Sequence, residues 1–508
     1  MNFIAFRLLT VSRISSDFRA NILSRSRGIA WSATGSATSE FDVVVVGGGV
    51  IGCSTARQLK INNPELKVAL LEKEDHLAFH QSGHNSGVLH AGIYYAPGSL
   101  KAKLCVRGID LAYEYCDKHK VPYKKIGKLI VAVEPIEVPR LENLFERAQK
   151  NGCKSIEMID GSEIKNYAPF CRVIQDIFLC FNVMIKRIQE LSISDVSKFF
   201  FSKNKDCVTL HAQGLKALWS PYTGIIDWGL VTKSYAQDFK NRGGVVYTKY
   251  PLKTLLFVGE SSKENVVNNY PVIIESEPSL SKIRCKYVIT CCGLQSDHIA
   301  KLSGGTSDPK IVPFRGEYLL LTSESKKKLV TTNVYPVPDP RLPFLGVHFT
   351  PRMNGDVWLG PNAVLAYKRE GYKYSQISLV DLYDTLTYRG TRKLIVKFFG
   401  YGMKELYRGI WIRAQVKQLQ RFMPDLSISD VTRGPAGVRA QALDSNGNLV
   451  DDFIFDYGQG ELSQYVLHVR NAPSPGATSS LAIAEMIYEK ASIRFGLKQQ
   501  VSELSSAL

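Results

Sequence analysis

The sequence contains no pair of cysteines in CxxC spacing and no Cys/His cluster at metal-ligand spacing, although it has ten cysteines. Scattered cysteines of this kind are typical of reduced core thiols, so we expect no metal. No window reaches eighteen apolar residues, which argues against a membrane-spanning helix. Internal repeats are also lacking. These absences point to a globular protein whose 508 residues suit two interleaved domains.

Acidic residues are almost missing from the first 39 positions, where Asp17 is the only one. Five arginines recur there among Ser, Ala and Leu. This Arg-rich, Ser-rich, acid-poor composition is typical of a mitochondrial transit peptide. We therefore interpret 1–39 as a transit peptide and expect a mitochondrial protein. The alternative is a disordered basic arm.

Glycine and proline are absent from residues 173–213, although the whole chain has 39 glycines and 22 prolines. A surface insertion should be richer in such turn formers. The segment begins with valine, whose codons start with GT, and ends with glutamine, which CAG encodes; these are the end bases of a typical intron. We interpret 173–213 as an atypical insertion. Our main hypothesis is a retained intron, and the alternative is a lineage-specific insertion.

Positive charge exceeds negative charge by 17 at pH 7. Residues 389–421 hold nine Lys and Arg against Glu405 alone. Each base near an anionic membrane contributes about 1 kcal/mol, so this segment predicts peripheral membrane association. The alternative is a solvated pair of helices. Shallow apolar contacts would come from Leu394, Ile395, Phe398 and Phe399.

The clearest motif is a GxGxxG that follows a buried apolar strand and opens a helix. Its glycines permit a tight turn, let the backbone approach a pyrophosphate and allow the helix to pack on the sheet. They are Gly47, Gly49 and Gly52. A second apolar strand ends in Glu72, whose carboxylate can accept hydrogen bonds from ribose hydroxyls but would repel a ribose phosphate. The pattern predicts a dinucleotide site for a cofactor without a 2′-phosphate.

Longer blocks resemble one family. HQSGHNSGVLHAGIYY, PFRGEY, GPAGVRAQALD and NAPSPGATSS are similar to mitochondrial L-2-hydroxyglutarate dehydrogenases, which belong to the flavoproteins shaped like D-amino-acid oxidase and glycine oxidase. The resemblance implies FAD and the oxidation of L-2-hydroxyglutarate, a small dicarboxylate, to 2-oxoglutarate by hydride transfer to flavin N5. It also implies electron delivery to a quinone or another respiratory-chain acceptor, at the matrix side of the inner membrane.

The strand and helix patterns, together with this resemblance, predict an α/β fold. We expect a Rossmann-like FAD-binding domain interleaved with an antiparallel-sheet (α+β) substrate domain, of the D-amino-acid oxidase and glycine oxidase type. A second strand–glycine–helix turn at Gly293 should meet the cofactor from the other side. The FAD-binding domain is expected at 40–98, 225–308 and 425–500. The substrate domain is expected at 99–224 and 309–424.

An alcohol substrate needs a base for its hydroxyl proton, and histidine has a suitable pKa. We predict His90 and His348 in the pocket and leave their ranking open. Arginine can hold a carboxylate with its planar fork. The resemblance gives Arg439 the place of the carboxylate-binding arginine of amine-oxidising relatives. Arg315 is a weaker second clamp, and Tyr335 would add a hydroxyl donor.

The segment NAPSPGATSS precedes the last expected helix, whose positive end would stabilise negative charge on reduced flavin. From it we predict Ala477 and Thr478 at the cofactor and Asn471 and Ser474 at the substrate. The loop before His90 should run along the flavin with contacts from His84, Asn85 and Ser86. Distant relatives carry flavin covalently on a histidine near this loop, so His84 is also a candidate for covalent attachment, although its HNSG context differs.

Other functions fit parts of the pattern. An amine oxidase, another flavin-dependent 2-hydroxy-acid oxidoreductase or a glycerol-3-phosphate dehydrogenase would use the same fold. The two arginines and two histidines expected in the pocket disfavour the amine oxidase. The net charge also raises the hypothesis of an RNA-binding flavoprotein. Because the chain has no aromatic–basic interleaving and no RNA module, we expect no nucleic-acid partner.

Overall fold

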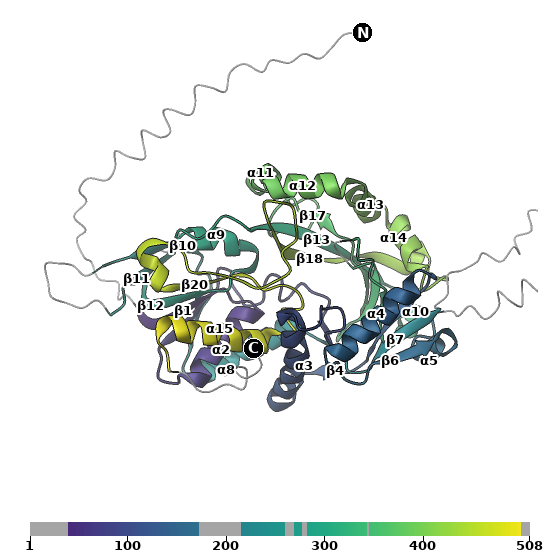
Figure 1. Cartoon of the computed structure of the whole chain (residues 1–508), viewed down its shortest axis with the longest axis horizontal. Coiled ribbons are helices and arrows are strands. Elements are labelled where there is room, and N and C mark those ends of the chain that lie inside the picture. Colours follow the sequence, from purple (N-terminus) through teal and green to yellow (C-terminus); the bar gives the residue numbers. More distant parts are fainter. Residues whose placement is uncertain (1–38, 172–214, 260–268, 277–281, 343–344, 499–508) are drawn as a thin grey trace, which may run out of the picture. The chain divides into compact units, whose positions relative to one another are not determined.

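The computed structural model describes residues 39–171, 215–259, 269–276, 282–342 and 345–498 (Figure 1). Residues Ser39–Leu508 form one compact unit. Apart from Ser39, the expected transit peptide lies outside the described residues, and so does the expected insertion at 173–213. Both interpretations therefore stay predictions.

The first sheet has eight strands and carries the glycine-rich turn. The strands are β1 (Ser39–Val46), β2 (Val68–Leu71), β9 (Val245–Tyr247), β10 (Leu252–Phe257), β11 (Val272–Ser276), β12 (Lys282–Thr290), β19 (Ile454–Asp456) and β20 (Val466–Asn471). The order is β10-β11-β12-β1-β2-β9, with β20 beside the second half of β12 and β19 beside β20. Strands β9, β2, β1, β12 and β20 are parallel, as in a dinucleotide-binding sheet.

Burial on both faces explains why an apolar β-branched run forms the central strand β1. Val43 and Val45 pack into a core cluster with helices, whereas Val44 packs into a second cluster with β10 and β11. Full burial of one such side chain contributes roughly 1.5–3 kcal/mol. The helices of the first cluster lie together in Figure 1. They are α2 (Val50–Asn62), α3 (Leu100–His119), α8 (Trp228–Asn241) and α15 (Ser480–Phe495).

The second sheet has nine strands. They are β5 (Lys128–Ala132), β6 (Glu157–Asp160), β7 (Lys216–Ser220), β13 (Lys310–Leu321), β14 (Asn333–Pro336), β15 (His348–Pro351), β16 (Val357–Gly360), β17 (Val364–Leu365) and β18 (Val431–Leu443). Their order is β17-β13-β16-β15-β14-β5-β7-β6, and β18 pairs along β13. All pairs are antiparallel except β14 with β5, so the expected antiparallel sheet is mixed at one place. A small sheet, β3 (Val88–Leu89), β8 (Gly224–Ile226) and β4 (Tyr123–Lys124), accompanies the two large ones.

Several helices flank the second sheet (Figure 1). They are α4 (Glu137–Lys150), α5 (Ile164–Tyr167), α10 (Glu324–Lys327), α11 (Leu379–Thr387), α12 (Arg389–Lys397), α13 (Phe399–Ile410) and α14 (Ile412–Leu419); α9 (Ser296–Lys301) follows β12. Within the described ranges, no helix combines the length and the apolar character needed to cross a bilayer. A sheet with a parallel centre that carries the glycine turn, interleaved with a largely antiparallel sheet, confirms the predicted fold class.

Candidate active site

A cavity of about 630 Å³ joins the two large sheets. Val46 and Leu71, the last residues of β1 and β2, line one part of it. Tyr318 of β13 and Arg439 of β18 line another part. In open α/β sheets, ligands bind in the crevice at the carboxyl ends of the strands. The cavity therefore connects a nucleotide-binding edge with side chains of the substrate domain.

The turn between β1 and α2 is shaped for close approach of a ligand. Gly47 has a φ of +112°, and a Cβ there would lie 2.4 Å from the carbonyl oxygen of Cys291. A Cβ at Gly52 would lie 1.8 Å from the carbonyl oxygen of Gly47, so only glycine fits at either position. Gly47 and Gly49 line the cavity at the start of α2, where N–H groups and the helix dipole favour phosphate.

Glu72 lies at the end of β2 and also lines the cavity. Its Oε2 accepts a hydrogen bond from the backbone N–H of Gly48 at 2.7 Å, and its Oε1 accepts one from that of Glu74 at 2.9 Å. These bonds fix the carboxylate where a ribose partner is expected. The glycine turn, the helix end and Glu72 together fit a dinucleotide such as FAD.

The loop that precedes β3 forms another wall, with His84, Asn85 and Ser86 among its lining residues. The Asn85 amide donates to two loop carbonyls at 3.0 and 2.8 Å, and its Oδ1 accepts from the N–H of Gly87. The Asn85 side chain therefore shapes the loop. The His84 ring packs against Tyr372, with centroids 4.3 Å apart. Covalent attachment of flavin to His84 stays a prediction.

Gly293, Ala477 and Thr478 line the cavity as well. Helix α15 begins at Ser480, and the N–H groups of Ser479 and Ser480 close turns onto the carbonyls of Pro475 and Ala477. Ala477 and Thr478 therefore belong to the turn before the helix. The Thr478 hydroxyl accepts a hydrogen bond from the backbone N–H of His90 at 3.2 Å, which ties this turn to the histidine loop.

Arg439 and His90 face the same cavity. Arg439 extends from β18 with an exposed side chain, and His90 directly follows β3. Burial, followed by the positive charge of Lys128, holds the pKa of His90 well below its usual range. His90 is therefore a neutral ring at neutral pH, which is the form that can accept a proton.

His348 and Tyr335 lie in the layer next to the cavity wall and do not line it. The His348 ring is 4% exposed, stacks on Tyr335 with centroids 4.1 Å apart, and lies near Tyr318. Its Nδ1 donates to the carbonyl of Gly346 at 3.1 Å. Burial lowers the pKa of His348 to about 3. Of the two predicted histidines, the structure brings His90 to the cavity.

Arg315 does not reach the cavity. Arg439 pairs opposite Phe314, the neighbour of Arg315 in β13, and neighbouring strand positions point to opposite faces. Arg315 is fully buried, with Nε 3.1 Å from Oε1 of Glu317 and the guanidinium 3.9 Å from the centre of the Tyr374 ring. This corrects the prediction of a second clamp, since an ion pair on the far face of the sheet holds that side chain.

Asn471 and Ser474 both line the cavity. The Asn471 amide, however, donates to the carbonyls of Val450 and Asp452 at 3.1 and 2.8 Å. Its donors therefore hold a neighbouring loop, and the structure does not support a donor role towards substrate. Ser474 stays a candidate for substrate contact.

Lys128 lies beside the candidate site and was missed by sequence reasoning. It begins β5, is 1% exposed, and its Nζ lies 3.2 Å from Nδ1 of His90. Its Nζ also lies 4.5 Å from the centre of the Tyr335 ring. Burial lowers the pKa of Lys128 to about 7. The available signal was a lysine inside the otherwise apolar strand sequence GKLIVAV.

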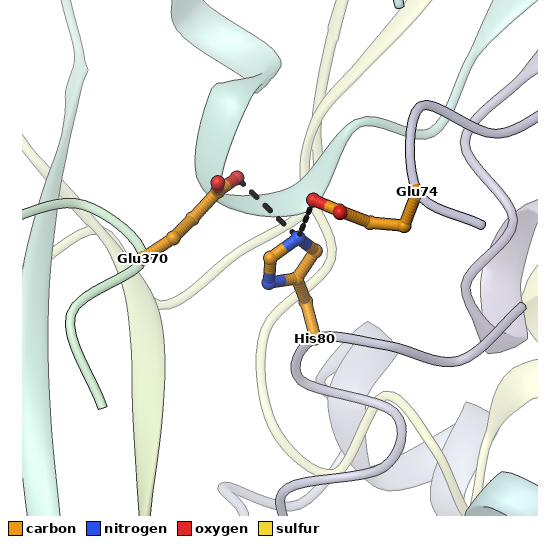
Figure 2. A group of neighbouring side chains, drawn as sticks. All are labelled: Glu74, His80 and Glu370. Carbon is orange, nitrogen blue, oxygen red and sulfur yellow. Dashed lines mark hydrogen bonds and ion pairs between the residues drawn. The ribbon is translucent and has the colours of Figure 1, made fainter. Parts of the chain in front are cut away.

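Figure 2 shows Glu74, His80 and Glu370, whose nitrogen and oxygen ligand atoms lie within 4.8 Å of one another. Lys73 binds the same two carboxylates, with Nζ 2.8 Å from Glu370. Burial alone would raise the pKa of Glu370, but hydrogen bonds to Lys73 and Gln295 and the nearby His80 hold it below its usual range. Because Lys73 supplies the cation, we interpret the cluster as an ion-pair network that joins the cofactor loop to the substrate domain. The absence of a metal stays a prediction.

Comparison with known proteins agrees with this geometry. The sequence profile of the family described as FAD dependent oxidoreductase matches residues 42–180 and 194–490. L-α-glycerophosphate oxidase from Mycoplasma pneumoniae, solved with FAD bound, has a similar fold, with a TM-score of 0.65, 22% identity, and coverage of 92% of this chain and 97% of that one. Glycine oxidase from Geobacillus kaustophilus has a TM-score of 0.59 at 12% identity, with coverage of 92% and 97%.

These matches place the chain in the family of FAD-dependent oxidoreductases. FAD is therefore its cofactor, which confirms the prediction. The mitochondrial L-2-hydroxyglutarate dehydrogenase of Caenorhabditis elegans is 61% identical over 458 residues, 90% of this chain and 94% of that protein. The human enzyme of the same name is 48% identical over 474 residues, 93% of each. Within the larger group, the chain belongs to the L-2-hydroxyglutarate dehydrogenase family.

Proposed function

We propose that this chain oxidises L-2-hydroxyglutarate to 2-oxoglutarate. The observation that carries the proposal is the placement of Arg439 and His90 in one cavity, next to the dinucleotide cradle. The names of its relatives support the substrate. Other flavin enzymes of this fold stay alternatives on fold alone, and no described feature favours them.

The side chains divide the chemistry between them. Arg439 binds a carboxylate of the substrate and fixes the hydroxyl-bearing carbon. His90 takes the hydroxyl proton as general base, because its ring is neutral and faces the cavity. When bound, FAD supplies the acceptor for the hydride. His348, enclosed beside Tyr335, supports the wall from the adjoining layer.

The electron acceptor is proposed to be a quinone or another carrier of the respiratory chain. The relatives are named mitochondrial, which supports a location in the mitochondrion. The matrix side of the inner membrane is part of the proposal. An enzyme that hands electrons to such an acceptor gains from being held at the membrane surface.

Helices α11–α13 carry the features of a surface that meets an anionic membrane. Val396 is 80% exposed and Leu379 78%. Monomeric proteins rarely expose contiguous apolar patches of this kind without a partner. The exposed apolar residues on these helices and at their ends include Leu379, Val380, Tyr383, Val396, Phe399, Met403, Tyr407 and Trp411.

Exposed basic residues lie on the same helices, and their charge favours anionic lipid as the partner. They include Arg389, Arg392, Lys393, Lys397 and Lys404. The structure corrects two of the four expected contacts: Leu394 is only 7% exposed and packs in a core cluster with Phe314 and Leu443, and Phe398 is partly buried against the same cluster. Phe399 and Ile395 stay exposed, as the proposal requires.

Vesicle flotation tests the surface. The protein should float with vesicles of phosphatidylcholine plus an anionic phospholipid, and added salt should weaken the binding. Val396→Glu should reduce flotation, whereas Ile136→Glu, a change at an exposed residue before α4, should not. If the protein bound neutral vesicles as strongly as anionic vesicles at every salt concentration, the proposal would be refuted.

The visible spectrum tests the substrate. L-2-hydroxyglutarate should bleach the flavin anaerobically, and the D enantiomer, amino acids and glycerol phosphate should leave it oxidised. Bleaching by an amino acid but not by L-2-hydroxyglutarate would overturn the proposed reaction.

A further inference from the structure

Lys128 and His90 form a pair at the edge of the cavity, linked by the contact between Nζ and Nδ1 at 3.2 Å. His90 lines the cavity, whereas Lys128 is buried behind it. The contact with Lys128 therefore occupies Nδ1 and leaves Nε2 as the ring nitrogen that can meet a substrate.

The protonation state of Lys128 decides the tautomer of His90. An ammonium group has only donors, so it must donate to Nδ1, and the neutral ring then carries its proton on Nε2. A neutral amine has a lone pair and can accept the Nδ1 proton, which leaves Nε2 unprotonated. His90 is thus a base towards the cavity only when Lys128 is a neutral amine.

The surroundings favour the neutral amine. No carboxylate among the described residues forms an ion pair with Lys128, and a buried ammonium without one is costly. The rings of Tyr335 and Tyr94, 4.5 and 5.3 Å from Nζ, offset part of that cost. Burial lowers the pKa of Lys128 to about 7. The titratable and charged groups around the pair are Tyr94, Cys105, Cys153, Tyr335, His348 and Arg439.

We propose that Lys128 is the terminal proton acceptor of the oxidation and acts through His90. The step rests on the proposed function, in which His90 is the base. The C2 hydroxyl proton moves to Nε2 of His90, and the Nδ1 proton moves to Nζ of Lys128, which becomes an ammonium. With FAD bound, the flavin would accept the C2 hydrogen together with its electron pair, and the C–O bond would become a carbonyl. Lys128 returns its proton to water after the product leaves.

Two substitutions test the proposed transfer of the proton through His90 to Lys128. Lys128→Met removes both donor and acceptor, and kcat/KM should fall about 10- to 100-fold, as for other partners that fix a histidine tautomer. Lys128→Arg keeps a positive charge that cannot be neutralised, so it holds the proton on Nε2. The arginine variant should therefore be slower than the methionine variant at every pH. FAD absorbance and melting temperature identify the variants that remain folded.

The pH profile separates a proton acceptor from a structural lysine. In the wild type, kcat/KM should rise with pH through an apparent pKa near 7 that belongs to the Lys128–His90 pair. This rise should be absent from the pH profile of Lys128→Met. A folded Lys128→Arg variant with wild-type activity would refute the proton transfer to Lys128. A Lys128→Met variant whose kcat/KM still rises through the same pKa would also refute it. Wild-type turnover in His90→Asn would instead overturn the base assignment of the proposed function.

Discussion

The two faces of the β13–β18 pair carry one arginine each, and the two are held very differently. Arg439 stands exposed at the cavity wall. Arg315, on the opposite face, is fully buried beside Glu317 and under the ring of Tyr374. Helices α13 and α14 contact strands β17 and β16 of the same sheet. One arginine thus lies at the cavity, and the other is enclosed beside its own carboxylate partner.

The difference teaches how one sheet serves both binding and stability. A guanidinium presented to a cavity is available to a carboxylate, and its loss should appear in substrate kinetics. A buried guanidinium is tied to its own carboxylate, and its loss should appear in folding stability. The cavity face also adjoins His348 and Tyr335, which are buried and neutral, so they add no charge to the wall.

The largest effect is expected on the cavity face at His90. His90→Asn removes the general base, and turnover should fall about 10²–10⁴-fold. The loss should shrink at high pH, where hydroxide replaces the base. His348→Asn should cost less, because its ring is enclosed and does not line the cavity. Steady-state kinetics of both variants, matched for FAD content, measures this; equal losses at both positions would contradict the ranking.

The second-largest effect on kcat/KM is expected for Arg439→Met. Loss of a charge-assisted bidentate contact should cost roughly 2–4 kcal/mol, or about 30- to 1,000-fold in kcat/KM. FAD should remain bound, because the proposed dinucleotide cradle is formed by the glycine turn and Glu72 and does not depend on the Arg439 side chain. An unchanged kcat/KM in the fully flavinylated variant would refute the role of Arg439.

Arg315→Met sharpens the contrast from the other face. Removal of one partner of a buried ion pair should destabilise the fold by about 3–5 kcal/mol, because the Glu317 carboxylate loses its partner. The double variant Arg315→Met/Glu317→Leu should recover part of that loss. In the folded fraction, kcat/KM should stay within about threefold of wild type, a change below 1 kcal/mol. Denaturant unfolding measures the effect on stability, and steady-state kinetics measures the effect on kcat/KM. A large loss of kcat/KM without a loss of stability would show that Arg315 affects catalysis as Arg439 does.

Local signals in the sequence predicted residues that line the cavity. The glycine turn, Glu72 and Gly293 each follow the end of a strand, so their positions depend on a few neighbouring residues. The cavity wall on the side of the second sheet was harder to predict from the sequence. It brings together β3, β5, β13 and β18 from distant parts of the chain. Arg315 was misplaced because a one-residue shift along a strand reverses its face. Lys128 was overlooked because a charge at the start of an apolar strand looks like a solvated strand end until β14 and β7 are seen to enclose it.

The smallest effect is expected at the far edge of the same sheet, where the segment 173–213 would be inserted. Strand β7 pairs with both β5 and β6, and Ala217 shares a core cluster with Cys171, so the described residues on both sides of the segment are already packed. A retained intron contributes nothing to that packing. Deletion of 173–213 should therefore leave FAD content, kcat/KM and melting temperature unchanged, and the transcript should join Arg172 to Gly214. Peptides from the segment in active purified enzyme, or a deletion variant that fails to bind FAD, would show instead that the far edge needs the insertion.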